Sequence, residues 1–156
     1  MFDPTTLTGF HTWLSLIAIA AGLLLLPAMA AGRPAGGLAE LFLATAVLTS
    51  ATGFLFPFNG FLPSHAVGVL ALAVLAAVLA GRFGFGLAGR WVRVYAAGFV
   101  ASLYFLLFVL VAQIFMKVPG LGGDASPGFL VAQLALLVAA GWLGVVAWRR
   151  AGLMAR

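Results

Sequence analysis

Long apolar runs separated by short breaks dominate the pattern of hydrophobic and polar positions along this chain. Each run is close to the roughly 20 residues that a helix needs to cross the hydrocarbon core of a bilayer. None shows the alternation over about ten residues that marks the strands of a membrane β-barrel. The pattern therefore predicts five membrane-spanning helices, over residues 11–31, 38–58, 64–81, 94–116 and 128–148.

Each break between the runs holds residues that end helices. Gly-Arg-Pro occupies 32–34, Asn-Gly occupies 59–60, a glycine-rich stretch covers 81–90, and two prolines bound 119–127. Glycine and proline are the strongest local signals for turns and loops. Because the breaks are too short to hold a soluble domain, we predict a single all-α membrane domain over residues 1–156.

Composition supports this interpretation, because hydrophobic residues make up 65% of the chain and charged residues only 7%. A soluble domain carries about 25% charged residues. The mean hydropathy of +1.22 agrees with a membrane protein. The net charge of +5 is therefore not interpreted as a signature of nucleic-acid binding. Cysteine is absent, which excludes disulfides, thiol catalysis and cysteine metal ligands.

The basic residues are distributed unevenly among the breaks. Of the eight, only Lys117 lies in a break on the side of the N-terminus. The others follow the first, third and fifth predicted spans, at Arg33, Arg82, Arg90, Arg93, Arg149, Arg150 and Arg156. Cytoplasmic loops carry the excess of Lys and Arg. We therefore expect a multi-pass protein of the bacterial inner membrane, with its N-terminus outside and its C-terminus in the cytoplasm.

The costlier polar residues fall in the outer halves of the predicted spans. Neutral histidine, threonine and glutamine beside apolar walls suit hydrogen bonding to a quinone carbonyl or a lipid headgroup. They are equally suited to tie helices together, since threonine in a helix often bonds its own i−4 carbonyl. Both interpretations stay open for the ligand-binding candidates His11, Thr49, Thr52, His65, Gln113 and Gln133.

Small residues four apart allow close contact between membrane helices. Three such pairs predict a tightly packed bundle: Ala18/Gly22, Gly98/Ser102 and Ala140/Gly144. Aromatic residues near the predicted outer edge, Phe54 and Phe56 among them, are interpreted as interfacial anchors.

Residues at the span ends predict local contacts. Glu40 is the acid at the cytoplasmic start of the second span, where a helix N-terminus favours a carboxylate. We expect it to pair with Arg33 or with the arginines of 82–93. Asp3-Pro4 predicts an N-cap followed by the first helical residue. Ser64 is predicted to cap the third span.

The two histidines open the first and third spans, at similar depth on the outer side. A b-type haem needs two axial histidines at matched height, so a haem between His11 and His65 is an alternative. No other metal site is predicted, because two histidines without nearby acids or thiols form an incomplete ligand shell.

The sequence holds no nucleophile–base set, phosphate loop or carboxylate pair. We therefore expect a non-enzymatic protein, most simply an accessory or assembly subunit of a larger inner-membrane complex. Its expected partners are membrane lipids and other membrane subunits rather than nucleic acid. The alternative is a small redox protein that carries the haem described above.

The stretch SLYFLLFVLVAQIFMKVP at 102–119, followed by SPGFLVAQ at 126–133, resembles a family of small bacterial integral membrane proteins. The resemblance covers about a third of the chain and implies no activity. This chain departs from the family pattern in the outer loop, which is shorter and less polar. The resemblance implies that Gln113, Lys117 and Gln133 belong together.

Overall fold

The computed structural model describes residues 3–31, 36–57 and 63–154, and it is all-helical over them. The predicted all-α class is confirmed. Four of the helices in this part of the chain are long and apolar enough to cross a membrane. The elements are α1 (Leu7–Ala30), α2 (Gly37–Gly53), α3 (Pro63–Leu79) with its π-helical extension η1 (Ala80–Gly84), α4 (Trp91–Lys117) and α5 (Pro127–Met154).

Helix α2 is shorter than its predicted span. It has 17 residues and ends at Gly53, five residues before the predicted limit at 58. A turn over Phe54 and Leu55 follows, closed by the N–H of Leu55 donating to the carbonyl of Thr52 at 3.1 Å. Pro57 then disfavours helical geometry at the residue before it. The apolar run therefore continues past the helix.

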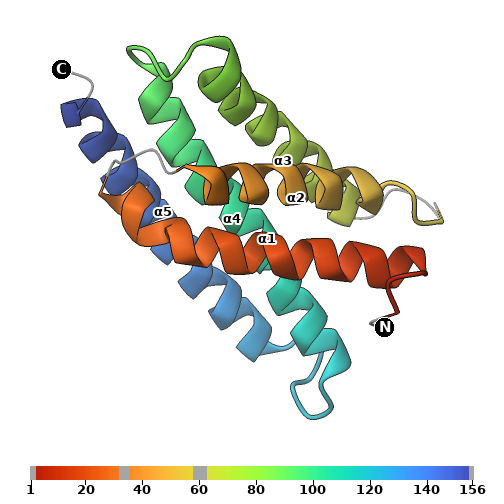
Figure 1. Ribbon diagram of the computed structural model, residues 1–156. Helices are drawn as coiled ribbons and strands as arrows, with labels where there is room; N and C mark the ends of the chain where they lie inside the picture. Colours follow the sequence, from red (N-terminus) through yellow and green to blue (C-terminus); the bar gives the residue numbers. More distant parts are fainter. Residues whose placement is uncertain (1–2, 32–35, 58–62, 155–156) are drawn as a thin grey trace.

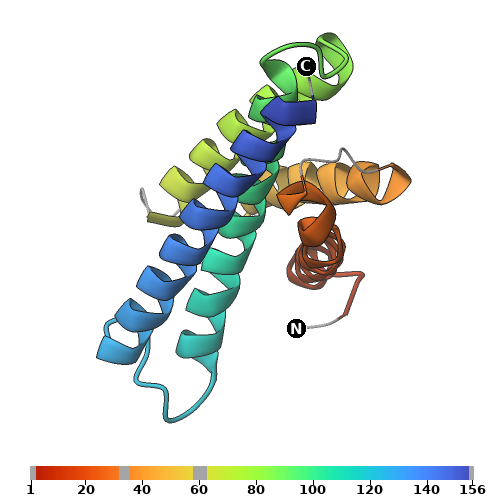
Figure 2. The same ribbon diagram turned by 90° about the vertical axis from the view of Figure 1, so that its left-hand side faces the viewer.

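Figure 1 shows α1 and α2 as an antiparallel pair that crosses α4 obliquely, while α3, α4 and α5 run alongside one another. Helix α4 contacts α1, α3 and α5. Figure 2 shows α1 nearly end-on, with the far half of the α4–α5 hairpin extending beyond it. Helix α4 is therefore central, and the hairpin reaches past the α1–α2 pair.

The core lies where α1 and α2 cross α4. The rings of Phe42 and Phe99 pack with their centroids 4.2 Å apart. A Cβ on Gly22 would come within 2.7 Å of Cδ1 of Leu103 and 2.9 Å of Cε2 of Phe42. Ala18, one turn earlier, is fully buried. The predicted close contact at Ala18/Gly22 is confirmed.

Helix α3 packs on α4 through the second predicted pair. A Cβ on Gly98 would lie 2.5 Å from Cγ2 of Val78, so glycine is needed for this approach. Ser102 is buried and donates its hydroxyl to the carbonyl of Gly98 at 2.9 Å. The Gly98/Ser102 contact is therefore confirmed.

For the third predicted pair, Ala140/Gly144, the predicted close helix contact is wrong for Gly144. Nothing lies within 4 Å of a Cβ built on Gly144, although Ala140 packs at the edge of the α4–α5 contact. The close approach is instead made by Ala147 and Ala151, which are fully buried against Val92 and its neighbours on α4. Both pairs have helical spacing, so the pattern did not distinguish the buried one.

The start of α1 also differs from the prediction. Thr6, not Asp3, is the N-cap, and its Oγ1 accepts from the N–H of Gly9 at 3.1 Å. The Asp3 carboxylate instead accepts from the N–H and the hydroxyl of Thr5, at 3.0 and 2.7 Å. Position 9 requires glycine, because a Cβ there would overlap the carbonyl of Asp3.

Candidate functional site

Two of the predicted ligand-binding residues meet at the contact between α1 and α2. His11 lies in the second turn of α1, and its Nδ1 is 2.9 Å from Oγ1 of Thr52 near the end of α2. Thr52 is buried and His11 is half-buried. A side-chain hydrogen bond between residues 41 positions apart in the sequence thus joins α1 to α2.

The hydrogen bonds of Thr52 determine which residue donates in its contact with His11. Its hydroxyl donates to the carbonyl of Leu48 at 2.7 Å. A hydroxyl has one hydrogen, so Oγ1 acts as the acceptor for the Nδ1–H of His11. A neutral His11 therefore carries its lone pair on Nε2, which is the atom left to accept a hydrogen bond or bind a metal.

Two phenylalanines that follow α2 pack on the histidines. The ring of Phe56 meets His11 edge-on at a centroid distance of 5.3 Å. The ring of Phe54 lies 6.2 Å from that of His65. The sequence predicted these rings only as interfacial anchors and did not predict that they pack on the histidines. Their position within four residues of Thr52 was the available signal.

Thr49 lies one turn before Thr52 on the buried face of α2. Its Oγ1 is buried and has no hydrogen-bond partner among the described residues. By contrast, Thr45 donates to the carbonyl of Leu41 at 2.7 Å, as expected for a threonine in a helix. An unpaired buried hydroxyl costs about 1–3 kcal/mol. Thr49 is therefore a buried polar group that the described part of the chain leaves unsatisfied.

The predicted glutamines lie on a different part of the molecule, on the α4–α5 hairpin. Gln133 is buried, and its Nε2 donates to the carbonyl of Phe108 at 3.0 Å rather than to Gln113. Oε1 of Gln133 is buried with no partner in the described part of the chain. Gln113 is half-buried on α4.

The two segments that resemble the bacterial membrane-protein family, 102–119 and 126–133, also pack against each other on this hairpin. The rings of Phe115 and Phe129 pack edge-to-face at 5.7 Å. This hairpin extends past α1 and α2 (Figures 1 and 2). His11 bonds to Thr52 on α2, whereas Gln133 bonds to the backbone of Phe108 on α4, so these two candidates are bound to different helices.

The predicted charge pair forms with an arginine of the 82–93 stretch. Arg82 lies on η1, and its Nη2 is 3.0 Å from Oε1 of Glu40. Arg33, the other predicted partner, lies outside the described residues, as does the side chain of Ser64. Because Arg82 lies on this π-helical turn, its guanidinium reaches Glu40 on α2.

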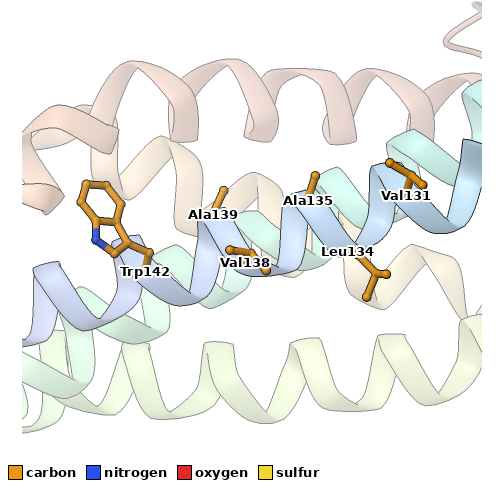
Figure 3. Close-up of a pocket in the computed structure, with 6 residues that line it drawn as sticks. All are labelled: Val131, Leu134, Ala135, Val138, Ala139 and Trp142. Carbon is orange, nitrogen blue, oxygen red and sulfur yellow. The ribbon is translucent and has the colours of Figure 1, made fainter.

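Two shallow apolar grooves lie away from the histidines. The larger, of about 660 Å³, follows one face of α5. Figure 3 shows that all of its lining residues come from that helix: Val131, Leu134, Ala135, Val138, Ala139 and Trp142. The second groove, of about 310 Å³, lies over α4 between α3 and α5.

Comparison of the chain with protein-family models found no match, and neither did comparison with curated proteins or with solved structures. The functional assignment therefore depends on the geometry described above.

Proposed function

We propose that this chain is a non-enzymatic accessory subunit of a larger complex in the bacterial inner membrane, crossing the bilayer five times with its N-terminus outside. The asymmetric distribution of basic residues supports the orientation. The 17 residues of α2 are at the lower limit of about 17–25 for a membrane-spanning helix, so its length permits the fifth crossing.

The exposed face of α5 is the observation that carries the accessory role. In the most apolar stretch of each helix, 39% of the residues are buried in α1 but only 6% in α5. The exposed face includes Ala135 and Ala139, which have the four-residue spacing that lets another helix approach closely. Val131, Val138 and Trp142 flank them (Figure 3). A helix of a partner subunit packing here would bury the least covered element of the bundle.

The test is purification of the tagged protein in a mild detergent, followed by identification of stably bound membrane proteins. We expect a partner to co-purify with the native chain and to be lost from Ala139→Trp, which blocks close helix approach. Ala44→Trp, at an exposed alanine of α2, is the matched control and should retain the partner. A homogeneous monomer, or a self-associated form with no other subunit, would contradict the accessory role.

We propose that the α1–α2 cluster binds a quinone or a lipid headgroup. Nε2 of His11 as acceptor and the unpaired hydroxyl of Thr49 support this proposal. Mass spectrometry of lipophilic molecules extracted from the purified protein provides the test. The double variant His11→Leu/Thr49→Val should lose the bound molecule, and an identical profile in both proteins would reject the site.

A b-type haem between His11 and His65 is the alternative. It is favoured by the contact with Thr52, because a haem-ligating histidine binds iron through one ring nitrogen while the other donates a hydrogen bond. Protein produced with ample haem should then show a Soret absorbance band that His11→Leu abolishes. An absent band in the native protein rejects this alternative.

A further inference from the structure

The second groove lies along α4, and two arginines occur at the start of α4, on the N-terminal side of the lining residues from this helix. Its floor is the α4 face that bears Val94, Ala97, Gly98 and Ala101, and its sides are α3 and the ring of Trp148 from α5. Figure 1 shows α4 lying between these two helices. The volume of about 310 Å³ is at the lower end of the roughly 300–1,000 Å³ of small-molecule sites.

The same side of α4 continues into Arg90 and Arg93, each one turn before a residue of the floor. The N–H of Val94 donates to the carbonyl of Arg90 at 3.2 Å, so helical geometry already holds there. Residues four apart on a helix are neighbours, which places Arg90 beyond Val94 and Arg93 beyond Ala97. The guanidinium of Arg93 occupies the space that a Cβ on Gly152 would fill, and is thus held between α4 and α5.

The chain has too few acidic residues to neutralise these arginines. It contains three in all. Glu40 pairs with Arg82. Asp124 lies in the connection between α4 and α5, at the opposite end of α4 from Arg90, and Asp3 precedes α1 at the far side of the molecule (Figures 1 and 2). No acidic side chain in the described part of the chain is therefore paired with Arg90 or Arg93.

We propose that this groove binds an anionic phospholipid, with an acyl chain along α4 and the headgroup phosphate between Arg90 and Arg93. Guanidinium groups bind phosphate oxygens with paired, charge-assisted hydrogen bonds. Basic pockets between membrane helices bind anionic headgroups in this way. The site requires that the chain lies in a bilayer, but it requires neither a partner on α5 nor a ligand at His11.

The test uses the full chain reconstituted in phosphatidylcholine vesicles with a trace of spin-labelled lipid. Electron paramagnetic resonance measures the fraction of labelled lipid held at the protein. We expect spin-labelled phosphatidylglycerol to be preferred over spin-labelled phosphatidylcholine, by on the order of five-fold for each arginine engaged. Arg90→Gln/Arg93→Gln should remove the preference. Ala97→Leu, which fills the groove without changing charge, should reduce it.

The matched control is Arg149→Gln/Arg150→Gln, which removes two exposed charges near the end of α5 and should keep most of the preference. An equal loss in both double variants would mean diffuse surface attraction and would overturn the site. No preference in the native protein, or an unchanged one in Ala97→Leu, would also overturn it. Millimolar inorganic phosphate should not displace the lipid, and displacement would mean that the phosphate contact alone accounts for binding and would reject the acyl-chain contact along α4.

Discussion

At the scale of single residues, the contact between His11 and Thr52 is the feature that links α1 to α2 most specifically. Its 2.9 Å hydrogen bond joins side chains of two helices, whereas Thr45 bonds only within its own helix. The sequence predicted both residues as ligand-binding candidates. It did not predict the pairing, because the spacing within each helix says nothing about how far one helix slides along the other.

This hydrogen bond should appear as a coupling energy in a double-mutant cycle. Hydrogen bonds between membrane helices average about 0.6 kcal/mol, with a maximum near 1.7. We expect coupling of that size between His11→Leu and Thr52→Val, measured by unfolding in detergent. The control cycle of His11→Leu with Thr45→Val should show coupling near zero. Equal coupling in the two cycles would contradict the geometry.

The turn before α1 should respond to pH through Asp3. The side-chain and backbone hydrogen bonds from Thr5 hold the pKa of the Asp3 carboxyl below its ordinary value of 3.8. A depressed carboxyl pKa stabilises the folded turn at pH values above the unfolded pKa. That stabilisation is lost as pH falls through the folded pKa. A carboxyl-carbon NMR titration should give a midpoint below 3.8, moving upward in Thr5→Val; an unmoved midpoint would contradict this contact.

At the scale of helices, close packing depends on which small residues face a neighbour. The three small pairs looked alike in the sequence, yet Gly22 and Gly98 face other helices and Gly144 does not. In a membrane protein both lipid-facing and buried faces are apolar, so hydrophobicity cannot orient a helix. The number and approximate limits of the helices were predictable from length and hydrophobicity, while the contact faces were predictable only in part.

Replacing these glycines tests that distinction. Gly22→Leu should destabilise the protein by about 1–3 kcal/mol, because the new side chain overlaps Leu103 and Phe42. Gly144→Leu places the same side chain where nothing lies within 4 Å and should leave unfolding in detergent nearly unchanged. Thermal unfolding of both variants provides the measurement, and a larger loss at Gly144 would refute the described packing.

The sequence did not predict which of the polar candidates contact one another, for a related reason. His11 and Gln133 both fall near the outer ends of predicted spans, but α1 and the α4–α5 hairpin cross obliquely (Figure 2). Depth along a helix therefore does not translate into proximity. The sequence predicted that Glu40 would pair with one of several arginines. It could not single out Arg82, because the position of this residue depends on the π-helical turn after α3.

At the scale of the whole molecule, the proposed five-span topology depends on α2 crossing the membrane. With five crossings, the segment before α1 and the α4–α5 connection face the same side. With four, in which α2 does not cross, they face opposite sides. The chain contains no cysteine, so single cysteines can be placed without removing any native thiol. The side reached by each can then be read with a membrane-impermeant maleimide.

The most direct test labels Thr5→Cys, Ala88→Cys and Asp124→Cys, three exposed positions, in intact spheroplasts. With five crossings, Thr5→Cys and Asp124→Cys should be labelled before permeabilisation, and Ala88→Cys only afterwards. Labelling of Asp124→Cys but not Thr5→Cys in intact spheroplasts would contradict the five-span topology.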